Sequence, residues 1–311
     1  MTATALHRAS PPRPQPQCCR FATTAMACRW ELVLECDPSD EAGNSPSRAA
    51  GVAEAVFEEV SHWHNRLNRF GSDSDVSQVN RASGRGPQQV ARDFAELLTV
   101  CESLRRSTGG LFDIRVATSP ESRLHDHSLS IDLQRSAVTL QAGVHLDLGG
   151  IAKGFAMDCA QRILSELGVR TALLHAGTSS TLAIGSPKSG PWQISIQAHS
   201  PTSQHDAARY DLVLQDAHLS VSSHGGRPTG HIRDPRNGSV SIDPIALTSD
   251  APSTAAIVAN SGLLAEALSK AAILNPHGHW AQAHRDSLTQ AIWKVGSTWF
   301  NRSFHPSSVG V

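Results

Sequence analysis

The 311-residue chain has few aromatic side chains, little net charge and no long apolar run. Aromatic residues make up 5% of the sequence, and the formal net charge is −1. Lys and Arg are scattered along the chain, so we expect no basic surface for nucleic acid or for an anionic membrane. No apolar run approaches the roughly 20 residues that cross a bilayer, so the sequence predicts no transmembrane segment.

The first 22 residues lack the apolar stretch of a secretory signal and carry four prolines between positions 11 and 16. We therefore expect a disordered tail over residues 1–22, a short C-terminal tail over residues 301–311, and a cytoplasmic protein. None of the six cysteines forms a C-x-x-C pair, which gives no support to a zinc site or a redox pair. Without a signal peptide, free thiols are the expected state of these cysteines.

Helical and strand patterns are interspersed along the rest of the chain. Apolar residues repeat at helical spacing over residues 52–67, 90–104, 151–167 and 263–273. Short β-type stretches lie between turn residues at 25–36, 129–133, 137–141, 144–148, 171–176, 181–185, 192–198, 210–215 and 219–223. Consecutive strands without strict βαβ alternation favour the α+β class. We expect one large domain over residues 23–300, with mixed or antiparallel sheets and packed helices.

The most informative motif is HLDLGGIAKGFAMD, at residues 145–158. It places Asp147 at the end of an expected strand, Gly149 and Gly150 in the turn, and Lys153 in the first turn of a helix. Glycines let a ligand approach the backbone, and the N–H groups of a helix N-terminus bind phosphate oxygens. The motif therefore indicates an anion site, and a tight turn with a solvated lysine is the alternative.

This motif is similar to a block that recurs in FAD:protein FMN transferases. Seven further segments match that family in the same order: AMAC at 25–28, LNRF at 67–70, DSDVS at 73–77 with Asn80, TGGLFDI at 108–114, LHAGTS at 174–179, LSVSS at 219–223 and HIRDPRNG at 231–238. The chain thus resembles the family over about residues 25 to 275. The resemblance implies FAD contacts at Met26, Phe70, Asp147, Lys153 and His231.

Two of these segments also have structural interpretations. In HIRDPRNG, Asp-Pro and Asn-Gly form turns readily, so this segment is equally explained as a loop, and His231 is its better ligand candidate. In TGGLFDI we expect the glycines to end the preceding helix, Phe112 to pack in the core, and Asp113 to hold the loop. Phe70 stands where the family usually has Tyr, so a stacking ring remains but a hydroxyl is missing.

The family resemblance also implies a Mg²⁺ site, and here the sequence departs from it. The family pattern is an Asp and, four residues later, a Thr, together with a backbone oxygen that corresponds to Gly150. This chain has Glu266 and Lys270 instead. An ammonium about 4 Å from a divalent ion is repelled by roughly 8 kcal/mol at an effective dielectric of about 20. Three alternatives follow: Ser269 supplies the hydroxyl, Lys270 replaces the metal, or Glu266 and Lys270 are a surface pair.

The activity that the resemblance implies is transfer of the FMN half of FAD to a Thr or Ser hydroxyl of an acceptor flavoprotein, with release of AMP. Such phosphoryl transfer depends on alignment and on neutralising charge at the phosphate oxygens. We expect Lys153 and Glu266 to be the catalytic residues and Gly150, Glu266, Ser269 and Lys270 to surround the metal position. The alternative is an FAD-binding carrier or sensor that has lost the transferase activity.

Overall fold

The computed structural model describes residues 17–36, 45–115, 128–198, 208–224, 232–236 and 252–304. Its centre is an eight-stranded sheet in which all neighbouring strands are antiparallel. In spatial order its strands are β1 (Gln17–Ala25), β2 (Cys28–Cys36), β6 (Ala172–Ala176), β7 (Ser180–Ile184), β10 (Ala217–Ser223), β11 (Thr254–Ala259), β12 (Leu288–Val295) and β13 (Thr298–Ser303). Within these ranges no helix is long and apolar enough to cross a membrane.

Two small sheets and six helices complete the described part of the chain. The helices are α1 (Pro46–Leu67), α2 (Asp75–Arg81), α3 (Arg92–Ser107), α5 (Ala152–Glu166), α6 (Gly262–Leu274) and α7 (Trp280–Ala283). The small sheets are β3 (Gln88–Gln89), β5 (Ala137–Leu140) and β4 (Leu129–Asp132), and the pair β8 (Trp192–Ala198) and β9 (Ala208–Leu214). The α+β class expected from the sequence is confirmed, and the large sheet is antiparallel throughout.

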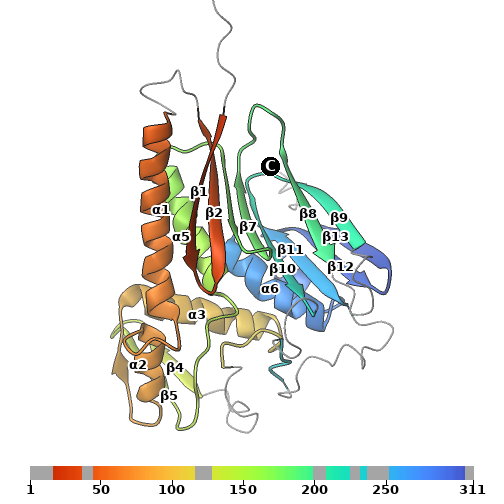
Figure 1. Cartoon of the computed structure of the whole chain (residues 1–311). Helices are drawn as coiled ribbons and strands as arrows, with labels where there is room; N and C mark the ends of the chain where they lie inside the picture. The colour runs from red at the N-terminus through yellow and green to blue at the C-terminus, as the bar shows by residue number, and fades with distance from the viewer. Residues whose placement is uncertain are drawn as a thin grey trace, which may run out of the picture.

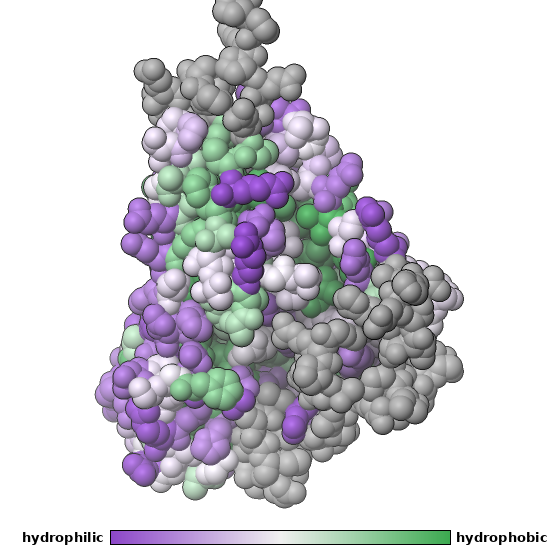
Figure 2. All heavy atoms as spheres, viewed as in Figure 1, coloured by the Kyte–Doolittle hydropathy of each residue, from purple (hydrophilic) through white to green (hydrophobic). Residues whose placement is uncertain are grey.

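Helices α1, α5 and α6 cover one face of the main sheet, and the β8–β9 pair lies toward its other face (Figure 1). The main core forms under the helices, and a second apolar cluster joins Ile196 and Leu214 of β8–β9 to Val258 and Ile292 of the sheet. In Figure 2, hydrophobic residues gather over β1–β2 and over the β8–β9 pair, between hydrophilic neighbours. A cleft lies between the main sheet and the β8–β9 pair.

Close backbone contact joins α5 to α6. A Cβ at Gly154 would lie 2.2 Å from the carbonyl oxygen of Gly262, so only glycine fits there. Asp158, one turn further along α5, accepts hydrogen bonds from the N–H groups of Gly262 and Leu263 at 2.6 and 3.0 Å and from the hydroxyl of Ser261 at 2.8 Å. Acceptors at a helix N-terminus satisfy N–H groups that have no partner within the helix. The AKG motif and Asp158 thus fix the start of α6 beside the start of α5.

Three local predictions differ from the structure. The strand expected over 25–36 is a hairpin, β1–β2, whose turn holds Met26 and Ala27 at φ 51° and 56°. Because β1 begins at Gln17, residues 17–22 belong to the sheet and not to a tail, and β13 likewise extends to Ser303. The strand expected over 144–148 is absent.

Residues 144–148 have no neighbouring strand because their backbone groups are bonded elsewhere. The N–H and C=O of Leu146 pair with the side chain of Asn80 at 2.7 and 2.9 Å, and the N–H of Asp147 donates to Ile114 at 2.7 Å. An amide side chain with both a donor and an acceptor can replace a strand in this way. Alternation of polar and apolar residues does not reveal such a partner.

The expectation of free thiols is wrong for two cysteines. Cys19 on β1 and Cys36 on β2 form a disulfide, with their Cα atoms 6.0 Å apart. The two residues come together because β1 and β2 are adjacent strands of one hairpin, which the sequence pattern had not indicated. Of the other cysteines, Cys18 is exposed, whereas Cys101 and Cys159 are buried.

Candidate active site

A cleft of about 740 Å³ opens between the main sheet, β8 and the N-terminal end of α5. Its floor comes from β6, β7 and β10, its wall from β8, and its polar end from the Gly149–Gly150 turn, α5 and α6. The residues that line it include Asp113, Asp147, Gly149, Gly150, Lys153, His175, Thr178, Ser179, Gln193, Ser195, Gln197, Ser222, Arg233, Glu266 and Lys270. A volume of this size accommodates a cofactor-sized ligand.

The polar end of the cleft is built around the carboxylate of Glu266, which is 2% exposed. The ammonium of Lys153 lies 2.5 Å from its Oε1 atom. Its Oε2 atom accepts the backbone N–H of Gly154. Glu266 belongs to α6 and Lys153 to α5, so the ion pair exists because the two helices start side by side.

A second ammonium, that of Lys270, approaches the same carboxylate from one turn further along α6. Its Nζ atom lies 3.7 Å from Oε1 of Glu266 and donates a hydrogen bond to the backbone oxygen of Glu266 at 3.1 Å. The chain of Lys270 crosses the Gly149–Gly150 turn, where a Cβ at Gly150 would lie 3.2 Å from Cε of Lys270. The end of the Lys270 side chain thus packs closely against Gly150, and an added Cβ there would require it to shift by a few tenths of an ångström.

The charges of this cluster alter one another. Burial raises the pKa of the Glu266 carboxyl, but the charges of Lys153 and Lys270 and the hydrogen bonds it accepts outweigh burial, and its pKa lies below the usual value. Burial lowers the pKa of Lys270 to about 8, against the opposing attraction of Glu266. A quarter of the Lys270 side chain still meets solvent, on the cleft side. With Glu266 ionised and both lysines protonated, the cluster carries one net positive charge.

Ser269 points away from this cluster. Its side chain is fully buried, and its hydroxyl donates to the backbone oxygen of Glu266 at 2.9 Å. It also lies 2.9 Å from the hydroxyl of Ser222 and 3.3 Å from that of Ser220, on β10. Ser269 therefore joins α6 to the sheet, and it is Ser222 whose side chain borders the cleft.

The groups around Glu266 do not suit Mg²⁺. Hard divalent cations require several oxygen ligands, and both oxygens of Glu266 are already engaged by Lys153 and Gly154. An ion bound to this carboxylate would lie near both ammoniums, and each would repel it by roughly 8 kcal/mol at about 4 Å and an effective dielectric of about 20. Within the described residues no cluster of three or more His, Cys, Asp or Glu side chains offers a metal site.

Asp147 borders the cleft next to the glycine turn. Its Oδ1 accepts the N–H of Gly149 at 2.9 Å, and its Oδ2 pairs with the guanidinium of Arg69 at 3.1 Å. Arg69 in turn lies over the ring of Phe70, 4.2 Å from its centroid. Phe70 is 81% exposed and does not border the cleft. The structure thus connects Asp147 to Phe70 through Arg69, at the margin of the site.

Of the two remaining flavin-contact candidates, one lies away from the cleft and the other is outside the described residues. Met26 lies in the β1–β2 turn, half-buried against the core, and its N–H donates to Nδ1 of His64 at 3.1 Å. His231 lies outside the described residues, although the adjoining Ile232, Arg233 and Pro235 border the cleft. Of the five candidates, the structure places Asp147 and Lys153 in the cleft.

The N-terminus of α5 offers fewer N–H groups than the sequence suggested. The N–H groups of Ile151 and Ala152 donate to the backbone oxygen of Leu148 at 2.9 Å each, and that of Gly154 donates to Glu266. These internal bonds leave the lysine side chains as the main cationic groups at this end of the cleft.

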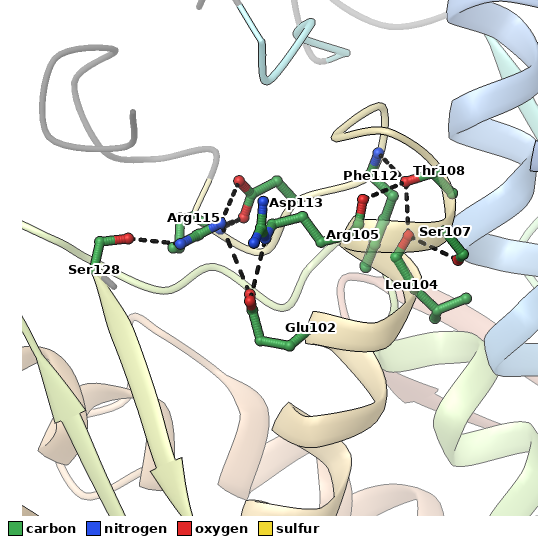
Figure 3. Close-up of polar contacts among 9 residues, drawn as sticks. All are labelled: Glu102, Leu104, Arg105, Ser107, Thr108, Phe112, Asp113, Arg115 and Ser128. Carbon is green, nitrogen blue, oxygen red and sulfur yellow. Dashed lines mark hydrogen bonds and ion pairs between the residues drawn. The ribbon is translucent and has the colours of Figure 1, made fainter. Parts of the chain in front are cut away.

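A buried ionic network fixes the loop that forms another edge of the cleft (Figure 3). Arg115, 1% exposed, donates from Nε and Nη2 to Asp113 at 2.9 and 3.1 Å and from Nη1 to Ser128 at 2.6 Å. Its guanidinium also lies 3.8 Å from Glu102 on α3. Asp113 accepts the backbone N–H of Arg115 at 2.9 Å, so it holds the loop as expected.

The remaining expectations for this loop are also confirmed. Gly109 and Gly110 have φ angles of 61° and 78° and donate to the last carbonyls of α3, while Phe112 is buried. Positive φ at the end of a helix is where glycine is favoured. The hydroxyl of Thr108 accepts the N–H of Phe112 at 3.2 Å, which directs the ring inward.

Several cleft residues were not identified from the sequence. Gln193, Ser195 and Gln197 alternate along β8 and face the cleft together, and the polar alternation in WQISIQA was the available signal. His175 on β6 and Arg233 also border the cleft, and His175 lies 3.7 Å from Glu31. Arg233 belongs to the HIRDPRNG segment, in which the histidine and the turn residues give the stronger sequence signals.

An α+β fold built on one large antiparallel sheet defines the structural class, and solved structures share this fold. The Pseudomonas stutzeri flavinyl transferase ApbE, in its apo form, is 22% identical, with a TM-score of 0.73 over 93% of this chain and 95% of its own. The ApbE protein of Thermotoga maritima is 20% identical, with a TM-score of 0.71 over 92% of this chain and 97% of its own. These likenesses establish the fold.

Sequence comparison then gives the family. The ApbE family model matches residues 26–293, so the chain belongs to the ApbE family. A Haemophilus influenzae protein named FAD:protein FMN transferase is 23% identical over 250 residues, which cover 66% of this chain and 70% of that protein. The resemblance that the sequence motifs indicated is thereby confirmed.

Proposed function

We propose that this protein is an FAD:protein FMN transferase. The observation that carries the proposal is the Lys153–Glu266–Lys270 cluster, which places two ammoniums at the end of a cofactor-sized cleft. The pyrophosphate of FAD carries about two negative charges, and cationic side chains at a preformed site stabilise such charge. Membership of a family that includes proteins named for this activity supports the assignment.

The reaction is a phosphoryl-type transfer from the pyrophosphate of FAD to a hydroxyl of the acceptor protein. The oxygen of a Thr or Ser hydroxyl on the acceptor attacks the FMN-side phosphorus of FAD, and a new P–O bond forms. The bond from that phosphorus to the bridging oxygen breaks, and AMP leaves with the bridging oxygen. The hydroxyl proton passes to the solvent or to AMP, so no oxidant or reductant is consumed.

Each residue of the cluster has a role in this proposal. Lys153 binds the pyrophosphate as a point charge, and its position comes from the salt bridge to Glu266. Glu266 orients both lysines, since its two oxygens are engaged within the protein. Asp147, held by Gly149 and Arg69, faces the sugar or base side of the ligand as an acceptor. The Mg²⁺ implied by the family resemblance has no suitable ligand set at Glu266, whose two oxygens are engaged by Lys153 and Gly154.

The partners follow from the reaction. FAD is the substrate, and the second substrate is a flavoprotein with a modifiable Thr or Ser, of the ion-pump or reductase type that the resemblance implies. The cytoplasmic location inferred from the sequence stays a prediction. The Cys19–Cys36 disulfide argues against it, because cytosolic thiols are kept reduced.

The test is transfer to an acceptor domain in solution. Purified protein, FAD and an acceptor flavoprotein domain that carries the modifiable threonine are incubated, and AMP is measured by chromatography while covalent flavin is measured by mass spectrometry. The proposal predicts equal amounts of both products. FAD binding without either product would identify the protein as a carrier or sensor instead.

A further inference from the structure

Two of the four lysines in the chain, Lys153 and Lys270, meet at one buried carboxylate. Arginine is far more common in this sequence, yet compact ammoniums occupy this position. Lysine acts as a point charge with three donors, whereas arginine presents a planar fork. Both side chains remain partly exposed to solvent: the exposed fraction is 17% for the side chain of Lys153 and 25% for that of Lys270.

The position of Lys270 is fixed on both sides. Its Nζ is held by the carboxylate and by the backbone oxygen of Glu266, and its methylene chain lies against the glycine turn at Gly150. The same place, between Glu266 and Gly150, is where the family resemblance implies a divalent cation. The side chain of Lys270 therefore fills the space and supplies positive charge there.

Resting on the proposed function, we propose that Lys270 takes the place of a divalent cation at the pyrophosphate site, so that FAD binding and FMN transfer need no Mg²⁺. Lys153 and Lys270 together contact the phosphate oxygens from two sides of Glu266. A fixed ammonium carries one charge and a metal carries two. With Glu266 ionised, Lys270 gives the cluster its one net positive charge, which offsets about half of the charge of a pyrophosphate with about two negative charges. Preorganised charges of this kind stabilise a transition state without reorganisation.

The first test uses Mn²⁺ alone as the probe and needs no activity. Electron paramagnetic resonance of free Mn²⁺ is recorded with the wild-type protein and with the double variant Glu266→Asp/Lys270→Thr. The proposal predicts that wild type leaves the free Mn²⁺ signal unchanged. The double variant, which loses one ammonium and gains a hydroxyl, is expected to reduce it. Stoichiometric loss of the signal with wild type would overturn the proposal.

The second test measures FAD affinity by calorimetry in EDTA and in millimolar Mg²⁺. Wild type is expected to bind FAD equally in both, within about twofold, whereas Lys270→Met, which keeps the chain length, is expected to lose about tenfold or more in EDTA. Lys270→Arg keeps the charge and is expected to retain most of the affinity. Lys188→Met removes an exposed lysine outside the cleft and serves as the matched control.

The two possible failures are separable. A loss of wild-type FAD affinity of about tenfold or more in EDTA that Mg²⁺ restores would overturn the role of Lys270 while leaving the proposed function intact. Metal-independent FAD binding with neither AMP release nor FMN transfer to an acceptor would contradict the proposed function and still support Lys270 as the substitute charge. Absence of FAD binding in both conditions would overturn both.

Discussion

The ammonium of Lys153 lies 2.5 Å from a carboxylate oxygen of Glu266, and the two residues come from helices that meet backbone to backbone. The salt bridge is buried on the Glu266 side and open on the lysine side, so the lysine is held in position and still faces the cleft. This arrangement depends on Gly154, because α5 and α6 cannot approach so closely with a larger residue there.

Replacing Lys153 by Ala is expected to weaken FAD binding by about 1.5–3 kcal/mol, the range for a hydrogen bond to a charged group. Calorimetry should show roughly a 10- to 150-fold increase in Kd. Lys188→Ala, at an exposed position outside the cleft, is the control and should leave Kd unchanged. Equal affinities for the two variants would move the pyrophosphate site away from Lys153.

Replacing Gly154 by Ala should destabilise the protein strongly, because the added Cβ would lie 2.2 Å from the oxygen of Gly262. We expect a loss of about 2 kcal/mol or more in the free energy of unfolding, in the range for overpacked sites. Gly51→Ala is the matched control: it lies in α1 with nothing within 4 Å of an added Cβ, and it should stabilise by about 0.5–1 kcal/mol. Chemical denaturation of both variants measures this contrast, and a neutral Gly154→Ala would show that the helices separate easily.

Arg115→Met should destabilise the loop that borders the cleft, because it leaves the buried carboxylates of Asp113 and Glu102 without their shared cation. Breaking a buried ion pair costs about 3–5 kcal/mol. Arg135→Met removes an exposed ion pair and should change the free energy of unfolding by less than about 1 kcal/mol. Similar midpoints of urea unfolding for the two variants would show that the network contributes little.

Thiol reactivity should distinguish the cysteines. Burial raises the pKa of Cys159 to about 11 and raises that of Cys101 further, so both remain protonated and inaccessible in the folded protein. Cys18 is exposed and should react first with a thiol reagent at neutral pH. Peptide mapping by mass spectrometry should find Cys101 and Cys159 labelled after unfolding, and Cys19 and Cys36 labelled after reduction. Rapid labelling of Cys101 in the native protein would contradict its burial.

The sequence predicted those parts of the fold whose signal is local. The helical repeats over 52–67 and 263–273 became α1 and α6, and the strands over 171–176 and 181–185 became β6 and β7. β1 was missed because four prolines precede it and its partner strand is recognisable only once the hairpin is formed. The segment 144–148 was misassigned because its partner is the side chain of Asn80, 66 residues away.

The candidate site was predictable where a motif and a helix start coincide. Asp147, Gly150, Lys153, Glu266 and Lys270 come together in the cleft, and the departure at Lys270 was visible in the sequence. The direction in which the Ser269 side chain points was not predictable from the sequence, because it depends on contacts with Ser220 and Ser222 of a distant strand. The family pattern gave Phe70 and Met26 as ligand contacts, but burial and direction place neither side chain in the cleft.

The most direct test of the central claim is a calorimetric titration of the purified protein with FAD and, separately, with FMN. The account predicts saturable binding of FAD and weaker binding of FMN, because the lysine cluster binds the pyrophosphate that FMN lacks. Absence of FAD binding at about 100 μM, equivalent to an affinity weaker than about −5.5 kcal/mol, or equal affinity for FAD and FMN would contradict it.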